Sequence, residues 1–323
     1  MVVVLRRQFT WLSALLLAAA VLLPAAGCSD SGTQAPAPAT PQASAVAPAG
    51  ALQPVESGFA EANGARLYYE VYGEGEPLLL IMGLGANHLS WTAQISVYSR
   101  EFRVIAFDNR GTGQSDFPAG AEYTIPVLAD DAAALLDALG VDSAHVYGIS
   151  MGGMIAQEMA LRHPDRVESL ILGATTPGGP NAVAPQPEAL TPLLEQGAAI
   201  DRSVNPALLD VLFSPGFLAD HGSELATAFQ SMADYPQTSR EAYQAQLRAV
   251  AAHDTYDRLP DIDAPTLLLH GTDDPLLPAG NGRILAERIP GAKLVLLNGA
   301  RHAYLLEKQA EADAAVLDFL RAH

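Results

Sequence analysis

Val-Tyr-Gly-Ile-Ser-Met-Gly-Gly, residues 146–153, is the stretch that decides the fold of this chain. An apolar strand pattern ends there in a G-x-S-x-G motif, and a helical pattern follows directly, which is the sequence form of a nucleophile elbow. A serine on so tight a turn has a strained backbone, and the residues two positions away on either side must lack a β-carbon, as Gly148 and Gly152 do. The turn lifts the Ser150 hydroxyl clear of the sheet and directs the Met151 N–H to where an oxyanion would form. Ser150 is therefore the candidate nucleophile, and chance occurrence of the motif is the competing interpretation.

The first 27 residues have the pattern of an export signal. Two arginines precede an apolar run over residues 9–23, which is too short for a membrane span. The end of this segment resembles a bacterial lipobox, although Ala25 stands where that motif usually has leucine. We therefore expect residues 1–27 to be a signal peptide and Cys28, the only cysteine, to carry a lipid that anchors the exported protein to a membrane of the cell envelope. Ser29 resembles the outer-membrane sorting pattern, and an ordinary secretory signal cleaved nearby is the alternative.

Residues 28–55 consist almost entirely of Ala, Pro, Ser, Thr, Gln and Gly, so they cannot bury enough apolar surface to fold. We expect them to form a disordered tether to a globular domain over residues 56–323. The formal charge of −18 becomes −20 when residues 1–27, which hold two arginines and no acid, are removed. So acidic a surface argues against nucleic acid as a partner.

Short apolar runs alternate with helical patterns over most of residues 56–323. Asn63-Gly64 ahead of them favours a tight hairpin, so the domain is expected to open with two antiparallel strands. Nearly continuous apolar strands are typical of a parallel sheet covered on both faces. The predicted fold class is therefore α/β, with a doubly wound, mostly parallel sheet. The predicted strands are residues 78–82, 103–107, 144–148, 167–173, 266–270 and 293–297, with helices at 125–139 and 151–163.

Residues 176–259 break this alternation. They contain no convincing strand; a Pro- and Gly-rich lead-in is followed by helical patterns at residues 206–213, 223–233 and 239–253. We expect this segment to be an inserted helical cap that lies over the carboxyl ends of the strands and determines which substrate enters.

Candidates for an acid and a base follow the last two predicted strands. Asp273 and Asp274 come just after residues 266–270, and His302 comes just after residues 293–297. A serine hydroxyl needs a base to take its proton, and that base needs an acid to fix its tautomer and stabilise its charged form. Strand ends of a parallel sheet meet at one edge, so these side chains are candidates for a catalytic triad with Ser150.

With these motifs in register, the chain resembles an α/β-hydrolase-fold serine hydrolase over residues 61–320. The order Ser150, Asp274, His302 is the order of that fold. The resemblance selects Asp274 as the acid because Gly271 and Pro278 frame it in a G-x-x-D-x-x-x-P pattern, and Asp273 is the alternative. The histidine turn departs slightly from the family pattern, since Arg301 occupies its second glycine position.

The resemblance also implies a second oxyanion donor in the loop at residues 82–85, where the Leu84 N–H would pair with that of Met151. Trp91, just past this loop, is a candidate substrate-binding residue, with core packing as the alternative. Residues 108–116 resemble a segment that braces the site from behind in relatives, so no catalytic step is assigned to Asp108 or Arg110. The remaining histidines have no metal-ligand spacing, and neither a metal nor a cofactor is expected.

The resemblance implies hydrolysis of carboxylic esters of small molecules through an acyl-enzyme on Ser150. Enol-lactone hydrolysis, carbon–carbon bond hydrolysis and aminopeptidase activity on the same fold remain alternatives, and export favours a general esterase. The alternative from another class is a catalytically inert lipoprotein that uses the fold as a binding module.

Overall fold

A single mixed sheet runs through the part of the chain that the computed structural model describes, residues 52–196, 205–232 and 234–323. The predicted signal peptide, Cys28 and nearly all of the predicted tether lie outside the described residues. The strand order is β1-β2-β4-β3-β5-β6-β7-β8, and only β2 runs against its neighbours, so the sheet is mostly parallel as the sequence predicts. The strands are β1 (Glu56–Ala62), β2 (Ala65–Tyr72), β3 (Glu76–Ile81), β4 (Phe102–Phe107), β5 (Ala144–Ile149), β6 (Val167–Gly173), β7 (Thr266–Gly271) and β8 (Lys293–Leu297).

The predicted hairpin forms at Asn63 and Gly64, between β1 and β2. Their φ angles are +46° and +76°, and a two-residue turn with both central residues at positive φ matches the twist of the strands that it joins. Ala62 pairs with Ala65 directly across this turn.

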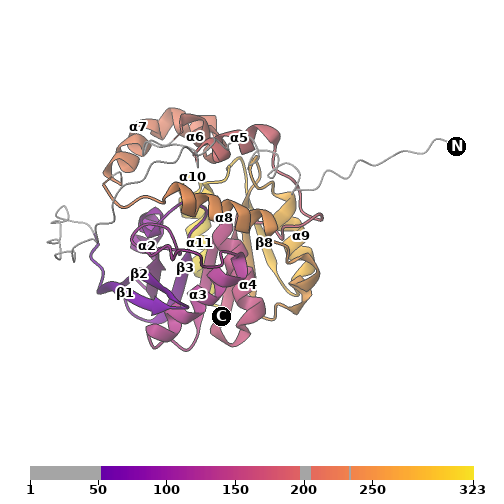
Figure 1. Cartoon of the computed structure of the whole chain (residues 1–323). Helices are drawn as coiled ribbons and strands as arrows, with labels where there is room; N and C mark the ends of the chain where they lie inside the picture. The colour runs from indigo at the N-terminus through magenta and orange to yellow at the C-terminus, as the bar shows by residue number, and fades with distance from the viewer. Residues whose placement is uncertain (1–51, 197–204, 233) are drawn as a thin grey trace.

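Helices cover both faces of the sheet (Figure 1), and each face has its own hydrophobic cluster. In β3, Leu79 and Ile81 join the cluster beneath α3, α4 and α9, while Leu78 and Leu80 join the cluster beneath α2 and α11. Because side chains alternate along a strand, a run that is buried on both faces must be apolar throughout. These helices, with the shorter turns, are η1 (His88–Trp91), α2 (Thr92–Tyr98), α3 (Ile125–Ala138), α4 (Met151–Arg162), η2 (Pro164–Arg166), η3 (Tyr256–Asp261), α9 (Gly280–Arg288), α10 (Tyr304–Glu307) and α11 (Gln309–Leu320).

We call the segment between β6 and η3 the cap. Its described residues form the helices α5 (Pro187–Gln196), α6 (Pro206–Leu212), α7 (Pro215–Ser231) and α8 (Arg240–Ala252) and the stretches that join them. The two ends of this segment pair, since Thr255 N–H donates to the Pro177 carbonyl at 2.8 Å and Gly178 bridges Asp254. Helices α5 and α6 pack on Leu276 and Leu277, which follow the carboxyl end of β7. The cap therefore lies over the carboxyl edge of the sheet (Figure 1).

Two cap helices differ from the sequence prediction. Helix α5 begins within the predicted Pro- and Gly-rich lead-in and extends past it, with one proline, Pro187, as its first residue and another, Pro192, inside it. Helix α7 begins at Pro215 rather than at residue 223, because the Ser214 hydroxyl accepts a hydrogen bond from Phe217 N–H and proline suits the first helical position.

A buried ion pair joins the loop after β4 to helix α3. Arg110 Nε donates to Asp131 Oδ2 at 2.7 Å, and the two side chains are only 4% and 1% exposed. Asn63 at the hairpin turn donates to the same carboxylate at 2.9 Å. The pair therefore holds together three segments that are far apart in the sequence.

Replacing Arg110 with methionine should leave Asp131 buried without a counter-ion and lower the free energy of unfolding by about 3–5 kcal/mol. Urea unfolding measures this loss. The double variant Arg110→Met/Asp131→Leu should recover most of it, because the orphaned charge is gone. Arg321→Met, which breaks an exposed pair with Glu101, should cost much less. Equal losses for the single and double Arg110 variants would contradict this account.

Candidate active site

Ser150 lies on the turn between β5 and α4 with φ +58° and ψ −121°, the strained geometry that the motif predicts. A β-carbon at Gly148 would lie 2.1 Å from the Gly152 carbonyl oxygen. A β-carbon at Gly152 would lie 2.0 Å from the carbonyl oxygen of Ile81 in β3. Both glycines are therefore required by close backbone approach, which holds the start of α4 against the sheet.

His302 and Asp274 meet at the ends of β8 and β7. His302 Nδ1 lies 2.8 Å from Asp274 Oδ2, and both residues are buried. The other oxygen of Asp274 accepts the backbone N–H groups of Leu276 and Leu277 at 2.8 and 2.9 Å, so the carboxylate cannot rotate away. With Nδ1 donating to the carboxylate, Nε2 is left as the basic nitrogen. Asp273, the alternative acid, is exposed and accepts from Thr272 instead.

The fold brings Ser150 and His302 to the same edge of the sheet. Ser150 N–H donates to the Gly173 carbonyl at the end of β6 at 2.9 Å. Three residues before the serine, the Tyr147 hydroxyl is hydrogen-bonded at 2.8 Å to that of Tyr304, which follows the histidine by two positions. Within the described residues, Ser150 Oγ and His302 make no hydrogen bond to one another. Such contacts often tighten only when substrate binds.

The predicted oxyanion loop packs directly on the serine. A β-carbon at Gly83 would lie 3.5 Å from Ser150 Oγ, so the loop backbone passes beside the hydroxyl. In the part of the chain that the structure describes, the Leu84 N–H has no hydrogen-bond acceptor. Met151 is the first residue of α4, and the first N–H groups of a helix have no acceptor within it. The two N–H groups chosen from the sequence thus belong to backbone that flanks Ser150.

Asp108 lies behind the oxyanion loop and takes part in several hydrogen bonds. From the sequence we expected only that its segment braces the site. Its Oδ1 accepts the backbone N–H of His88 at 2.9 Å and lies 2.7 Å from Nδ1 of that ring. Its Oδ2 accepts the Gln114 N–H and the Tyr235 hydroxyl, each at 2.8 Å. Tyr235 belongs to the cap, so this carboxylate joins the cap to η1, which follows the loop that carries Leu84.

The buried His88 ring lies between two carboxylates, since Nε2 also forms an ion pair with Glu70 at 3.2 Å, although not aligned as a hydrogen bond. Burial opposes a charge on the ring, but the contacts with Asp108 and Glu70 outweigh it and raise the pKa of His88 to about 9. Burial likewise opposes ionisation of Glu70, yet His88 and the hydroxyls of Tyr72 and Tyr68 lower its pKa to about 2. The cluster is therefore charged at neutral pH. No sequence motif marks Glu70, because its partners come from other elements.

Trp91 does not lie on the surface of the site. Its side chain is fully buried, and its ring stacks at a tilt on Tyr147 with ring centroids 4.9 Å apart. The substrate-binding role expected from the sequence does not fit this burial, and core packing is the interpretation that does.

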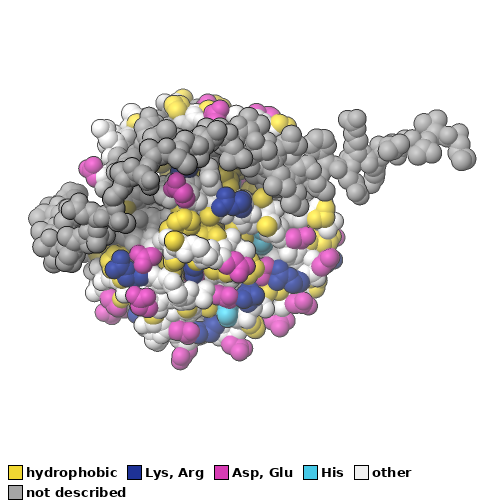
Figure 2. Space-filling model, in the orientation of Figure 1, with side chains coloured by type: hydrophobic (Ala, Val, Ile, Leu, Met, Phe, Trp, Pro, Cys, Tyr) yellow, Lys and Arg dark blue, Asp and Glu magenta, His cyan; other side chains and the backbone are white. Residues whose placement is uncertain are grey.

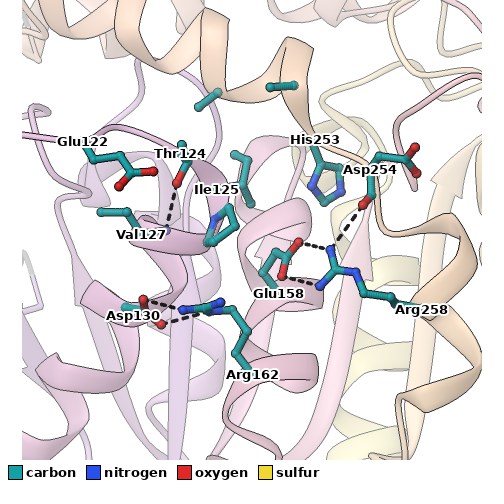
Figure 3. Close-up of a pocket in the computed structure, with 13 residues that line it drawn as sticks. Glu122, Thr124, Ile125, Val127, Asp130, Glu158, Arg162, His253, Asp254 and Arg258 are labelled. Carbon is teal, nitrogen blue, oxygen red and sulfur yellow. Dashed lines mark hydrogen bonds and ion pairs between the residues drawn. The ribbon is translucent and has the colours of Figure 1, made fainter.

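A separate hollow of about 490 Å³ lies between α3, α4, α8 and η3 (Figure 3). Its floor carries two ion pairs, Arg162 with Asp130 and Arg258 with Glu158. None of the predicted catalytic residues lines it. Because each arginine already has a carboxylate partner, we interpret these pairs as ties between helices.

On the face shown in Figure 2, basic side chains are interspersed with acidic ones. Over the whole sequence the acidic residues are the more numerous kind. Within the described ranges, no three His, Cys, Asp or Glu residues are grouped so as to hold a metal ion. Over the same residues, none of the helices combines the length and the apolar character that a bilayer span needs.

Comparisons with known proteins agree with this fold. Residues 76–309 match the family model described as alpha/beta hydrolase fold. The chain is 34% identical over 250 residues to the "Putative carbamate hydrolase RutD" of Azorhizobium caulinodans, covering 76% of this chain and 91% of that protein. It is 31% identical over 258 residues to 3-oxoadipate enol-lactonase 2 of Acinetobacter baylyi, covering 77% and 91%. Among solved structures, the enol-lactonase of Burkholderia xenovorans superimposes with a TM-score of 0.72 at 30% identity, covering 82% of this chain and all of that one.

Replacing His88 with glutamine should reveal the buried charge as a pH dependence of stability. Because the folded pKa of about 9 lies above the ordinary 6.5, the stabilisation is complete below pH 6.5 and is lost as pH rises through 9. The difference in unfolding free energy between parent and variant should therefore shrink by about 3 kcal/mol from pH 6 to pH 10. Urea unfolding of both proteins across this range measures it. A difference that does not change with pH would contradict the charged cluster.

Proposed function

The chain belongs to the alpha/beta hydrolase fold family, and from this premise we propose that it is a serine hydrolase that cleaves carboxylic esters of small molecules through an acyl-enzyme on Ser150. The observation that supports the proposal most strongly is the buried pair of His302 and Asp274 at 2.8 Å, at the same sheet edge as the strained serine. The proposed oxyanion donor, the Leu84 N–H, follows Gly83, which packs on that serine, and this N–H has no acceptor among the described residues.

In the first half of the reaction, His302 Nε2 takes the proton of Ser150 Oγ while Oγ bonds to the ester carbonyl carbon. The carbonyl oxygen becomes an oxyanion that the N–H groups of Leu84 and Met151 stabilise. When the carbon–oxygen bond to the alcohol breaks, His302 gives its proton to the departing oxygen. An acyl group then remains on Ser150.

In the second half, water attacks the acyl carbon while His302 takes one of its protons. The second oxyanion occupies the same pair of donors, and its collapse breaks the bond to Ser150 Oγ, which recovers the proton from His302. Water and ester have then become acid and alcohol. The carboxylate of Asp274 stabilises the imidazolium at each stage, and two backbone N–H groups hold that carboxylate in position.

The relatives support acyl transfer more broadly than ester cleavage alone. An enol-lactone is a cyclic ester, and a carbamate also has a carbonyl that becomes an oxyanion on attack. A further relative, 33% identical over 245 residues (76% of this chain and 84% of that protein), is the poly(3-hydroxyalkanoate) depolymerase of Ectopseudomonas oleovorans. Lactone hydrolysis is therefore the second candidate, and a panel of linear esters, lactones and carbamates separates the two.

Ser150→Ala should reduce kcat on p-nitrophenyl butyrate by at least about 10⁴-fold, because the nucleophile is lost while the oxyanion donors remain. Steady-state hydrolysis measures this, together with labelling of the parent at Ser150 by a fluorophosphonate probe. A folded parent that neither hydrolyses any substrate of the panel nor takes the label would instead favour an inert binding module.

The two neighbouring aspartates provide the matched control for this assignment. Asp274→Asn should lower kcat by about 10⁴-fold, because the amide stabilises neither the tautomer nor the charge of His302. Asp273→Asn, one residue away and exposed, should leave kcat within about twofold of the parent. A large loss of kcat for Asp273→Asn with a small one for Asp274→Asn would instead assign the acid of the triad to Asp273.

We also propose that the enzyme is an exported lipoprotein held to a membrane of the cell envelope through Cys28. This proposal is supported by the sequence alone: an apolar leader, a lone cysteine at its end and a Pro- and Ala-rich stretch that separates it from the enzyme.

Mass spectrometry of the mature amino terminus from a bacterial membrane fraction should find Cys28 as the first residue, with a mass increase from diacylglycerol. Cys28→Ala should remain unprocessed at that position and carry no lipid. An unmodified Cys28, or a mature terminus elsewhere, would refute the anchor without affecting the catalytic proposal.

A further inference from the structure

Helix α8 crosses the molecule between the other cap helices and the sheet layer (Figure 1). One face of it is buried, and that face is mostly alanine. The exceptions are Tyr243 and Gln246, and Gln246 is a fully buried polar side chain. Burying an amide costs free energy unless its hydrogen bonds are satisfied, so its partners show what it is fixed against.

The side-chain oxygen of Gln246 is hydrogen-bonded to the oxyanion loop. Gln246 Oε1 accepts the backbone N–H of Gly85 at 2.8 Å, across 161 positions of sequence. The Thr238 hydroxyl, also from the cap, donates to the carbonyl oxygen of the same Gly85 at 2.9 Å. Tyr243 closes the third side, since a β-carbon on Gly85 would lie 2.6 Å from its ring. Gly85 has φ +70°, so it is clamped by the cap in a conformation that suits glycine.

The clamp acts on the peptide that follows the proposed oxyanion donor. The peptide plane between Leu84 and Gly85 carries the Gly85 N–H. The preceding plane, between Gly83 and Leu84, carries the Leu84 N–H. The carbonyl of that earlier plane, Gly83, accepts Ala86 N–H at 3.3 Å. The N–H and C=O of a trans peptide point in opposite directions. Because the Gly83 C=O points into the turn toward the Ala86 N–H, the Leu84 N–H points out of the turn. With both planes held, the Leu84 N–H has one direction, and it is the N–H without an acceptor among the described residues.

We propose that Gln246, assisted by Thr238, is a positioning residue that aligns the Leu84 N–H of the oxyanion hole from the cap. This inference rests on the proposed function. Gln246 touches neither Ser150 nor His302 through any hydrogen bond of the described residues, and it acts only through Gly85. The cap thus completes the oxyanion hole in addition to covering it.

The role is distinguishable from simple attachment of the cap. The Gln246 amide nitrogen also lies 3.3 Å from the Tyr123 hydroxyl and 3.5 Å from the Arg110 carbonyl, so its loss also loosens α8. A loosened cap would weaken substrate binding and raise KM. A misdirected N–H acts only where negative charge develops, so it lowers kcat and slows reaction with a fluorophosphonate, which passes through a similar charged state.

Gln246→Met preserves volume and removes the acceptor for Gly85 N–H. We expect kcat for p-nitrophenyl butyrate to fall about 10- to 100-fold, with KM within about threefold of the parent. The rate constant for labelling of Ser150 by the fluorophosphonate should fall by a similar factor. Thr238→Val, at a less buried position, should act in the same direction, and Thr238→Ser, which keeps the hydroxyl, should restore the parent rate.

Gln157→Met is the matched control. Gln157 is an equally buried glutamine whose hydrogen bonds go to Thr176 and Thr255, away from the oxyanion loop. It should lose stability while keeping kcat. Folded Gln246→Met and Thr238→Val proteins with parental kcat, or with a raised KM alone, would overturn the inference and leave the proposed function standing. An unlabelled, inactive parent would overturn both.

Discussion

The close backbone approach at Gly148 and Gly152 is the constraint on which the rest of this structure depends. The start of α4 passes so near β3 and β5 that neither position has room for a β-carbon. Ser150 is consequently held at φ +58°, a conformation that a serine does not adopt without such support. The same approach places the first N–H of α4 beside the serine and brings the loop after β3 against its hydroxyl. One steric requirement thus positions the proposed nucleophile and both proposed oxyanion donors together.

Hydrogen bonds behind the site, in addition to the two glycines, fix the position of its backbone segments. Asp108 accepts hydrogen bonds from His88, Gln114 and Tyr235, which come from η1, the loop after β4 and the cap. Gln246 adds a direct contact from the cap to Gly85. A low-dielectric interior makes such bonds strong when they are satisfied, and each fixes a backbone segment that has no apolar core of its own. The cap and the oxyanion loop therefore form one connected unit.

Prediction from sequence succeeded for most elements with a local signal, and it failed for one cap helix and for one side chain whose surroundings come from other elements. The hairpin at Asn63, the apolar strands and the capped helix after Thr124 all formed as expected, because their signals lie within a few residues. Helix α5 was missed because its prolines resemble those of a loop, and one of them is tolerated inside the helix. The position of Trp91 along the chain suggested a contact with substrate, whereas in the structure this η1 residue packs against Tyr147 of β5.

The sequence by itself determined the fold class, the elbow serine and the order of acid and base, because each is written in glycine spacing, apolar periodicity or a motif of adjacent residues. The family pattern favoured Asp274 and left Asp273 as the alternative, and the tertiary structure decided between them, since the Asp274 side chain faces His302 whereas Asp273 is exposed. It also decided that His88 is enclosed by two carboxylates and that Gln246 reaches Gly85. Those contacts join residues from separate elements, and the free energy that selects them arises only when packing has excluded water from between them.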